Sequence, residues 1–231
     1  MTDAPDQRPI RSFVRRAGRQ TRAQDRALSE MWPRFGVELP KEGLAATLDL
    51  ATVFGRCAPC VLEIGFGNGD ALISMAGAAP DRNFLGVEVH APGIGHCLLG
   101  IERGGLTNVR LLMHDAADLL VERLTDGSLA GVHLFFPDPW HKKRHHKRRL
   151  VQARFVALLA ARIRPGGYFH VATDWPAYAA HISEVVAGNP AFQSVECVPG
   201  SPLGGRPRTR FEARGERLGH PIWETVYQRR S

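Results

Sequence analysis

Short apolar runs alternate with amphipathic stretches along most of this chain, beginning near residue 60. Five runs have the length and continuous apolar character of buried strands: residues 61–64, 84–89, 109–113, 132–136 and 168–172. The stretches after them have helical periodicity, at residues 71–78, 98–103, 116–124, 150–163 and 177–187. Strands that alternate with helices in this way predict a parallel sheet with helices on both faces.

Both ends of the chain depart from this alternation. Two further strands are predicted at residues 194–198 and 222–228, separated by a Gly-, Pro- and Arg-rich stretch that is too long for a plain turn. Residues 8–26 carry seven arginines and one acid, and helical patterns follow at residues 21–31 and 44–54. We therefore predict a doubly wound, Rossmann-like α/β sheet in residues 60–231, mostly parallel with an antiparallel last strand. Residues 1–59 are predicted to form a basic arm and a helical cap packed on this core, within a single domain.

The charge of the chain is concentrated in one place. The 231 residues carry a net charge of +7, and residues 141–149 hold six Lys or Arg and no acid, so the rest of the chain carries only +1 (7 − 6). Such a patch favours a polyanionic partner, nucleic acid above all. No apolar run is long enough for a membrane helix, and the N-terminus lacks the apolar segment of a secretory signal. We expect a cytoplasmic protein.

Four cysteines are too few and too scattered for a disulfide framework. Cys57 and Cys60 have the spacing of half a zinc or redox site, but no second pair matches them. We therefore predict no metal site.

The basic patch begins directly after an unusual loop. An apolar strand ends in Phe135-Phe136-Pro137-Asp138-Pro139-Trp140, and the next nine residues are all basic or histidine. A carboxylate beside an aromatic plane can hold a flat heterocycle, and a block of cations can hold a phosphate backbone. The combination predicts a site that acts on a base within a nucleic acid.

A glycine-rich turn follows the first predicted strand. Glu63 precedes Gly65, Gly67 and Gly69, which permit positive φ and close approach of a ligand. A dinucleotide-binding turn needs a small residue where this chain has Asp70, and a carboxylate there repels a pyrophosphate. The acids suit a ligand with cationic groups, such as S-adenosylmethionine.

Two more acids end the next two strands. Glu88 lies 19 residues beyond Gly69, the usual spacing of an acid that accepts hydrogen bonds from ribose hydroxyls. Asp115 follows the third strand, where it either binds the adenine amino group or caps the next helix. Because ligands in such sheets bind at the carboxyl ends of the strands, these acids are predicted to share one site.

These residues give the chain a resemblance to a known family. It resembles the bacterial tRNA (guanine-N7)-methyltransferases that modify guanine 46 in the variable loop, from about Arg11 to Arg229. The resemblance rests on these motifs: Arg11-Ser12-Phe13-Val14-Arg15, Glu63-Ile64-Gly65-Phe66-Gly67-Asn68-Gly69, Phe136-Pro137-Asp138-Pro139-Trp140-His141-Lys142, Ala172-Thr173-Asp174-Trp175 and Thr209-Arg210-Phe211-Glu212.

The resemblance implies two sets of contacts. S-adenosylmethionine would be bound through Glu63, the three glycines, Glu88, Asp115 and Asp138. RNA or the target base would be bound through Lys142, Arg144, His145, His146, Lys147, Arg148, Arg149, Asp174, Thr209, Arg210, Phe211 and Glu212. Family members commonly have Lys at the position of Arg210, a change that keeps charge but not geometry.

For the reaction we expect a mechanism of positioning, because guanine N7 carries an exposed lone pair and needs no strong base. Asp138 is the expected catalytic residue, accepting hydrogen bonds from the guanine N1–H and N2 amino group or contacting the methionine end of the cofactor. Trp140 either stacks on the base or wedges the loop. Asp174 either faces the same crevice or caps the next helix. The histidines of the basic block are expected to contact phosphate or solvent.

Three other functions compete with this one. The same fold and cofactor would also serve a methyltransferase acting on a small molecule or a protein, but the basic block argues against it. A non-enzymatic RNA-binding protein would not need the full set of strand-end acids. A polyamine-synthase-like enzyme should have an acidic pocket where this chain is basic. No obligate protein partner is evident, and the sequence does not decide between a monomer and a homodimer.

Overall fold

The computed structural model describes residues 12–13, 18–39, 47–196, 206–207, 212 and 221–231. Within this part, one sheet has the strand order β3-β2-β1-β4-β5-β7-β6. Its strands are β1 (Cys60–Ile64), β2 (Asn83–Glu88), β3 (Val109–Met113), β4 (Leu129–Phe135), β5 (Ile163–Thr173), β6 (Phe192–Val195) and β7 (Trp223–Arg229). β1 to β5 pair in parallel, whereas β7 runs antiparallel to both β5 and β6. The predicted fold class is confirmed.

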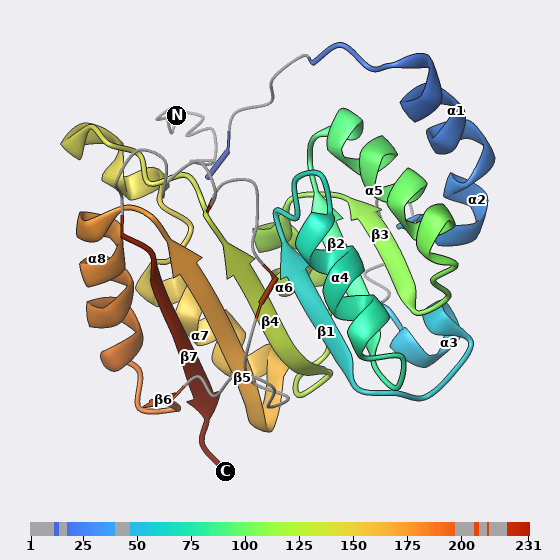
Figure 1. Ribbon diagram of the computed structural model, residues 1–231. Helices are drawn as coiled ribbons and strands as arrows, with labels where there is room; N and C mark the ends of the chain where they lie inside the picture. Colours follow the sequence, from blue (N-terminus) through green and yellow to red (C-terminus); the bar gives the residue numbers. More distant parts are fainter. Residues whose placement is uncertain (1–11, 14–17, 40–46, 197–205, 208–211, 213–220) are drawn as a thin grey trace, which may run out of the picture.

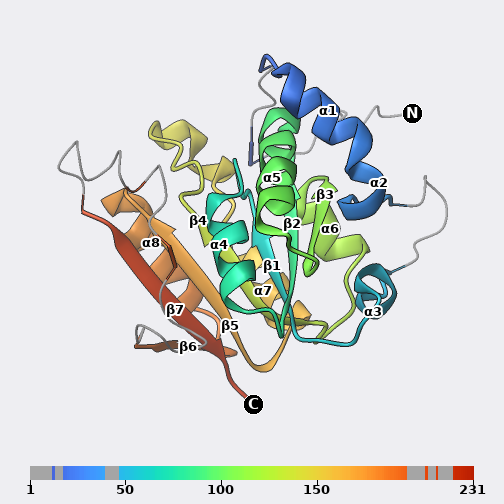
Figure 2. The same ribbon diagram turned by 45° about the vertical axis from the view of Figure 1, so that its right-hand side comes forward.

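Helices cover both faces of the sheet (Figures 1 and 2). α4 (Asp70–Ala78) and α5 (Ala91–Gly104) lie on one face, and α6 (Ala116–Glu122), α7 (Ala153–Arg162) and α8 (Pro176–Ala187) lie on the other. Side chains of alternate strand residues pack against the helices of opposite faces. Val61 packs with α4 and α5, and Leu62 and Ile64 pack with α6, α7 and α8. Every residue of β1 and β4 is buried, as expected for central parallel strands.

The N-terminal helices lie outside α5 (Figure 2). α1 (Arg22–Glu30) starts with a capping box, in which Thr21 and Gln24 exchange side chain–backbone hydrogen bonds. The side-chain amide of Gln24 also donates to the carbonyl oxygen of Pro92 at 3.1 Å. A Cβ at Gly95 would lie 2.9 Å from the Cβ of Gln24, so glycine permits this close packing of α1 on α5. α2 (Trp32–Phe35) follows at once.

Three predicted elements differ from the structure. The helix predicted at residues 44–54 is α3 (Leu50–Phe54) within the described residues, because the Asp49 carboxylate accepts the Ala51 N–H at 3.0 Å and caps the helix there. The strand predicted at residues 194–198 is β6, whose pairing with β7 ends at Val195; residues 197–205 lie outside the described residues.

The third difference concerns Arg164-Pro165-Gly166-Gly167, a sequence typical of a helix end, which follows the helix predicted at residues 150–163. These four residues belong to β5. Ile163 already pairs with Leu129, and the register shifts before Tyr168 pairs with Gly131. Pairing with a distant strand therefore overrides the local helix-ending signal. None of the helices in the described part is long and apolar enough to cross a membrane.

Candidate active site

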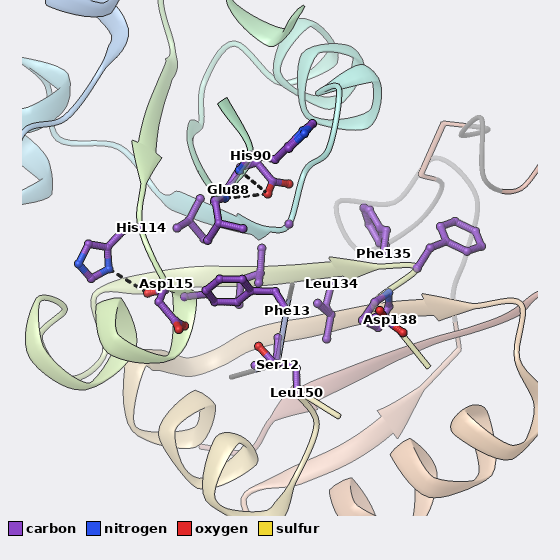
Figure 3. A pocket seen from close by; sticks show the side chains of 17 residues that line it. Ser12, Phe13, Glu88, His90, His114, Asp115, Leu134, Phe135, Asp138 and Leu150 are labelled. Atoms are coloured by element: carbon purple, nitrogen blue, oxygen red, sulfur yellow. Dashed lines mark hydrogen bonds between the residues drawn. The ribbon is translucent and has the colours of Figure 1, made fainter. Parts of the chain in front are cut away.

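A cavity of about 400 Å³ opens at the carboxyl ends of four parallel strands (Figure 3). It lies where the strand order reverses, since β1 leads through a helix to β2 on one side while β4 lies on its other side. Ligands of doubly wound sheets bind at this switch point. The lining residues from β1, β2 and β3 and the loops after them are Ile64, Gly65, Val87, Glu88, Val89, His90, His114, Asp115 and Ala116. The rest are Leu134, Phe135, Phe136, Pro137, Asp138, Leu150, Ser12 and Phe13.

The glycine turn has the backbone shape that the sequence indicated. Gly65, Gly67 and Gly69 have φ of +67°, +57° and +83°, and Gly69 is the N-cap of α4. Gly65 lines the cavity, and a Cβ there would meet nothing within 4 Å. A side chain at this position would therefore take up space in the cavity, so the glycine keeps room for a ligand against the backbone.

Glu88 lies at the end of β2 with its carboxylate at the cavity. One oxygen accepts the Gly67 N–H at 2.9 Å, and the other accepts the N–H groups of Val89 and His90 at 2.7 and 3.1 Å. These donors fix the carboxylate in place and tie the glycine turn to β2. The structure thus brings together two motifs that lie about twenty residues apart in the sequence.

Asp115 caps a helix and also lies at the cavity, so its contact with an adenine amino group stays a prediction. It lines the cavity, and its side chain caps α6 by accepting the Ala117 N–H at 2.9 Å. A carboxylate has several lone pairs, so this cap leaves acceptor capacity facing the cavity.

Glu63 lies elsewhere than expected. Its side chain is buried and is not among the residues that line the cavity. Burial raises the pKa of Glu63 to about 8, and its Oε2 is 4.0 Å from Nδ1 of the equally buried His133. Burial, followed by the charges of His170 and Arg82, holds the pKa of His133 well below its ordinary value. Burial thus favours the neutral form of both groups, and the expected contact of Glu63 with the cofactor stays a prediction.

The Asp138 loop combines an exposed carboxylate with a strained backbone. Phe136 and Trp140 have φ of +52° and +49°, the left-handed region that residues with a side chain rarely adopt. Between them, Asp138 lines the cavity, is exposed to solvent, and accepts the Trp140 N–H at 3.0 Å. Strain of this kind gathers at functional sites.

Trp140 connects this loop to the N-terminal arm. The residue is 9% exposed, and its Nε1–H donates to the carbonyl oxygen of Ser12 at 3.2 Å. The guanidinium carbon of Arg148 lies 4.0 Å from the ring centroid, and Arg148 also donates to the carbonyl oxygen of Phe13 at 3.4 Å. Of the two expected roles of Trp140, these contacts favour the wedge over base stacking. They also hold the Phe13 ring at the cavity, which Glu88, Asp115 and Asp138 line as well (Figure 3).

Most of the basic block forms a short 3₁₀ helix at the surface, η1 (Lys143–Arg148). The cations at its surface are Lys142, Lys143, Arg144 and Lys147, all exposed. His145 and His146 are half-buried; desolvation and then the surrounding cations lower the pKa of both. The positive charge of this surface at neutral pH therefore comes from lysine and arginine.

Arg149 departs from the prediction for this block. It is 4% exposed, and its guanidinium donates to the carbonyl oxygen of Pro139 at 2.9 Å and lies 4.8 Å from the ring centroid of Tyr178. It holds the Asp138 loop against α8 instead of facing solvent, so an RNA contact predicted for this residue does not fit its place in the structure.

Asp174 and Glu212 are the acids predicted to contact the target base. Asp174 follows the end of β5, and α8 begins after Trp175, which is its N-cap. The two alternatives for Asp174, facing the crevice or capping the helix, stay predictions. Glu212 accepts a hydrogen bond from Arg206 at 2.5 Å. The predicted contacts Thr209, Arg210 and Phe211 lie outside the described residues.

Sequence reasoning missed three residues with clear places in the site. Phe13 lines the cavity although only its motif had been noticed, and its side chain was not considered as a cofactor contact. His90 and His114 line the cavity next to the predicted acids. Each lies one or two residues from a strand-end acid, and this position in the sequence could have identified them as residues of the cavity.

Comparison with known proteins shows to which family the chain belongs. Residues 57–225 match the family described as "Putative methyltransferase". The chain is 53% identical to the tRNA (guanine-N(7)-)-methyltransferase of Alkalilimnicola ehrlichii, over 98% of this chain and 95% of that protein. It is 51% identical to the tRNA (guanine-N(7)-)-methyltransferase of Chromobacterium violaceum, over 96% of this chain and 97% of that protein.

Solved structures share the fold at low sequence identity. The 16S rRNA methyltransferase KamB superimposes with a TM-score of 0.58 at 18% identity, over 86% of this chain and 99% of that one. TrmN of Thermus thermophilus superimposes with a TM-score of 0.53 at 16% identity, over 78% of this chain and 47% of that one. With half of the residues shared over nearly the full length of its relatives, the chain belongs to the tRNA (guanine-N(7)-)-methyltransferase family.

Proposed function

We propose that this protein transfers the methyl group of S-adenosylmethionine to N7 of guanine 46 in the variable loop of tRNA. The observation that carries the proposal is the position of Asp138. This carboxylate lies between an acid-lined cavity at the sheet's switch point and an exposed row of cations. The cavity suits a nucleoside and the cations suit RNA phosphates, so Asp138 lies where the two substrates meet.

The residues around the cavity fit the proposed cofactor. Gly65 leaves space against the backbone, and the Glu88 carboxylate can accept ribose hydroxyls while keeping its backbone donors. Asp115 lines the same cavity and could accept a hydrogen bond from the adenine amino group. The bound cofactor supplies an electrophilic methyl group on a cationic sulfur. A cavity with carboxylates at its edge favours that positive charge.

Asp138 would act by positioning and electrostatics. Guanine N7 is already nucleophilic, so the protein must hold it in line with the methyl group and keep water away. The carboxylate of Asp138 can accept the N1–H and N2 amino hydrogens of guanine and stabilise the positive charge that methylation places on the purine. Asp174 and Glu212 are the further acids proposed for the target base.

The exposed cations of Lys142, Lys143, Arg144 and Lys147 would bind the tRNA backbone. The arginine-rich residues 8–26 would extend this contact from the arm, as part of the N-terminal unit of residues 1–59 that precedes the catalytic residues 60–231. We propose that the protein works in the cytoplasm, where it meets tRNA, without an obligate protein partner.

The test is methyl transfer from labelled S-adenosylmethionine to an unmodified tRNA transcript with guanine at position 46. A matched transcript with adenine there serves as the control. We expect label in the guanine transcript alone, recovered as N7-methylguanosine on nucleoside analysis. Equal label in both transcripts would refute the position. Cofactor binding without transfer to either transcript would favour another acceptor, such as a small molecule or a protein.

A further inference from the structure

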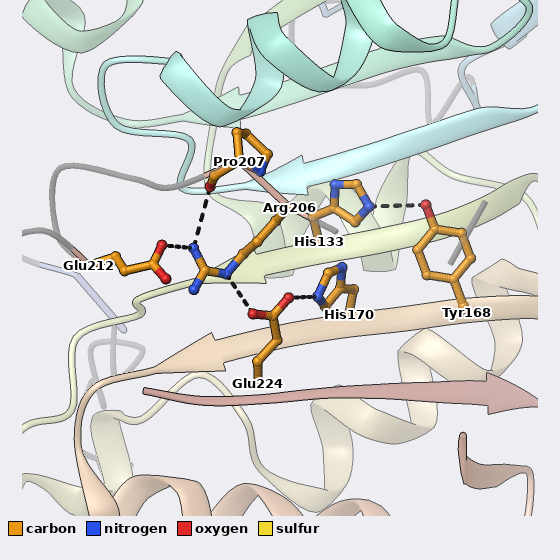
Figure 4. A network of polar contacts seen from close by, with 7 residues as sticks. All are labelled: His133, Tyr168, His170, Arg206, Pro207, Glu212 and Glu224. Carbon is orange, nitrogen blue, oxygen red and sulfur yellow. Dashed lines mark hydrogen bonds and ion pairs between the residues drawn. The ribbon is translucent and has the colours of Figure 1, made fainter. Parts of the chain in front are cut away.

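Arg206 is buried in a place where the sequence suggests a surface cation. It belongs to the Gly-, Pro- and Arg-rich stretch before β7, yet only 2% of its side chain is exposed. Its Nη1 donates to Oε2 of Glu212 at 2.5 Å, and its Nε lies 3.2 Å from Oε2 of Glu224 (Figure 4). A buried guanidinium is costly unless it is paired, and here two carboxylates pair with it.

The pairing anchors Arg206 to the sheet. Glu224 lies on β7 next to Ala172 of β5, and its other oxygen accepts a hydrogen bond from Nε2 of His170 at 2.7 Å. Burial pushes the pKa of Glu224 up, but the hydrogen bond from His170 and the charge of Arg206 outweigh it and hold the pKa below its ordinary value. Glu224 is thus ionised and faces a permanent cation from a fixed strand.

Arg206 also packs on the residues that lead to the Asp138 loop. Its guanidinium carbon lies 5.0 Å from the ring centroid of Phe136 and 5.8 Å from that of Phe135. Phe135 ends β4, and Phe136 carries the left-handed φ at the start of the loop. One guanidinium therefore contacts β7, Glu212 and the base of the Asp138 loop.

We propose that Arg206 is a positioning residue for the methyl acceptor: held by Glu224, it fixes Glu212 and the Phe136 end of the Asp138 loop relative to each other. This inference rests on the proposed function, because it assigns Glu212 and Asp138 to the same target base. Arg206 itself does not line the cofactor cavity. Its loss should affect the acceptor and spare the cofactor.

The test compares Arg206→Gln and Arg206→Lys with the intact protein, using the guanine 46 transcript. For Arg206→Gln we expect kcat to fall about 10²-fold, because a small misplacement of reacting groups has that effect, while the Kd for S-adenosylmethionine in calorimetry stays unchanged. Arg206→Lys should restore part of kcat, since lysine keeps the charge but lacks the fork that reaches both carboxylates. Arg154→Gln removes an exposed arginine of α7 and is the matched control.

Two outcomes would overturn the proposal. One is a kcat and KM for tRNA in Arg206→Gln equal to those of the intact protein. The other is a loss of cofactor affinity that matches the loss of activity, which would mean a general structural role. If Arg206→Gln does not fold, Glu224→Gln decides the matter, because it keeps the size of the anchor and removes its charge; unchanged kcat in that variant refutes the proposal. Absence of transfer by the intact protein would instead refute the proposed function.

Discussion

The side of the cavity proposed for the cofactor, at the ends of β1, β2 and β3, is held together by contacts of short to moderate separation along the chain, whereas the side proposed for the acceptor, beyond β4, is tied to residues more than a hundred positions away. Glu88 accepts from Val89, His90 and Gly67, which lie one, two and 21 positions away. On the acceptor side, Trp140 donates to Ser12 and Arg148 donates to Phe13, across 128 and 135 positions.

This difference separates two tasks. A nucleoside has one shape, and local turns after parallel strands suffice to hold it. A base within a folded RNA must be reached by a loop, an arm and a charged surface at once, so the acceptor side needs contacts that only the complete fold supplies. Substitutions on the cofactor side should therefore change the affinity for S-adenosylmethionine alone. Substitutions on the acceptor side should change how the loop, the arm and the charged surface are held relative to one another.

The largest effect is expected for Asp138→Asn, which also decides to which side this residue belongs. Asparagine can still accept the Trp140 N–H but loses the negative charge beside the methylated purine. We expect kcat to fall by about 10²–10³-fold, as for other groups that stabilise charge in a transition state, with the Kd for S-adenosylmethionine unchanged. A Kd that rises in step with the loss of activity would place Asp138 on the cofactor side.

Glu63→Gln should stabilise the protein in a pH-dependent way. Because the pKa of Glu63 in the fold is about 8, against an ordinary value of 4.5, the folded state keeps a proton that the unfolded state loses. Stability therefore falls as pH rises from 4.5 to 8, and glutamine escapes this fall. Urea unfolding should show no advantage of the variant near the lower pH and one on the order of 4 kcal/mol near the upper. Parallel pH profiles of the two proteins would show that Glu63 is ionised in the fold.

Glu88→Gln should weaken the binding of the cofactor and leave the use of tRNA unchanged. Loss of a charged acceptor for ribose hydroxyls is worth about 2 kcal/mol, or a rise of about 30-fold in the Kd for S-adenosylmethionine. At saturating cofactor, kcat and the KM for tRNA should be those of the intact protein. Glu102→Gln, which changes an exposed acid of α5, is the control. A changed KM for tRNA would contradict the separation of the two sides.

The smallest effects are expected in the basic block, where burial separates two kinds of cation. Lys143→Gln should reduce the slope of log affinity for tRNA against log salt by about 1 and leave the melting temperature unchanged. Arg149→Gln should lower the melting temperature, because Arg149 is buried against Pro139 and Tyr178. Binding titrations at several salt concentrations and thermal unfolding measure both. An equal change of slope in the two variants would mean that Arg149 contacts RNA.

The sequence predicted those features that depend on local order along the chain. The strands followed from continuous apolar runs, and Glu88 and Asp115 followed from their place at strand ends, which a parallel sheet brings to one edge. The burial of Arg149 and of Arg206 was not predictable, because a cation in a basic stretch looks the same whether it faces solvent or a distant carbonyl or carboxylate. Residues 164–167 illustrate the same limit for secondary structure, since the residues on either side of them, Ile163 and Tyr168, pair with β4.

The left-handed residues at either end of the Asp138 loop have a consequence for any attempt to make this protein more robust. Each such residue costs about 1–3 kcal/mol, so Phe136→Gly and Trp140→Gly would relax the backbone. The same exchanges would remove the ring under Arg206 and the indole that holds Ser12. Loss of a buried aromatic ring costs about 3–5 kcal/mol, more than the strain that is relieved. The packing of these two rings therefore keeps the strained loop in place, and glycine at either position should make the protein less robust.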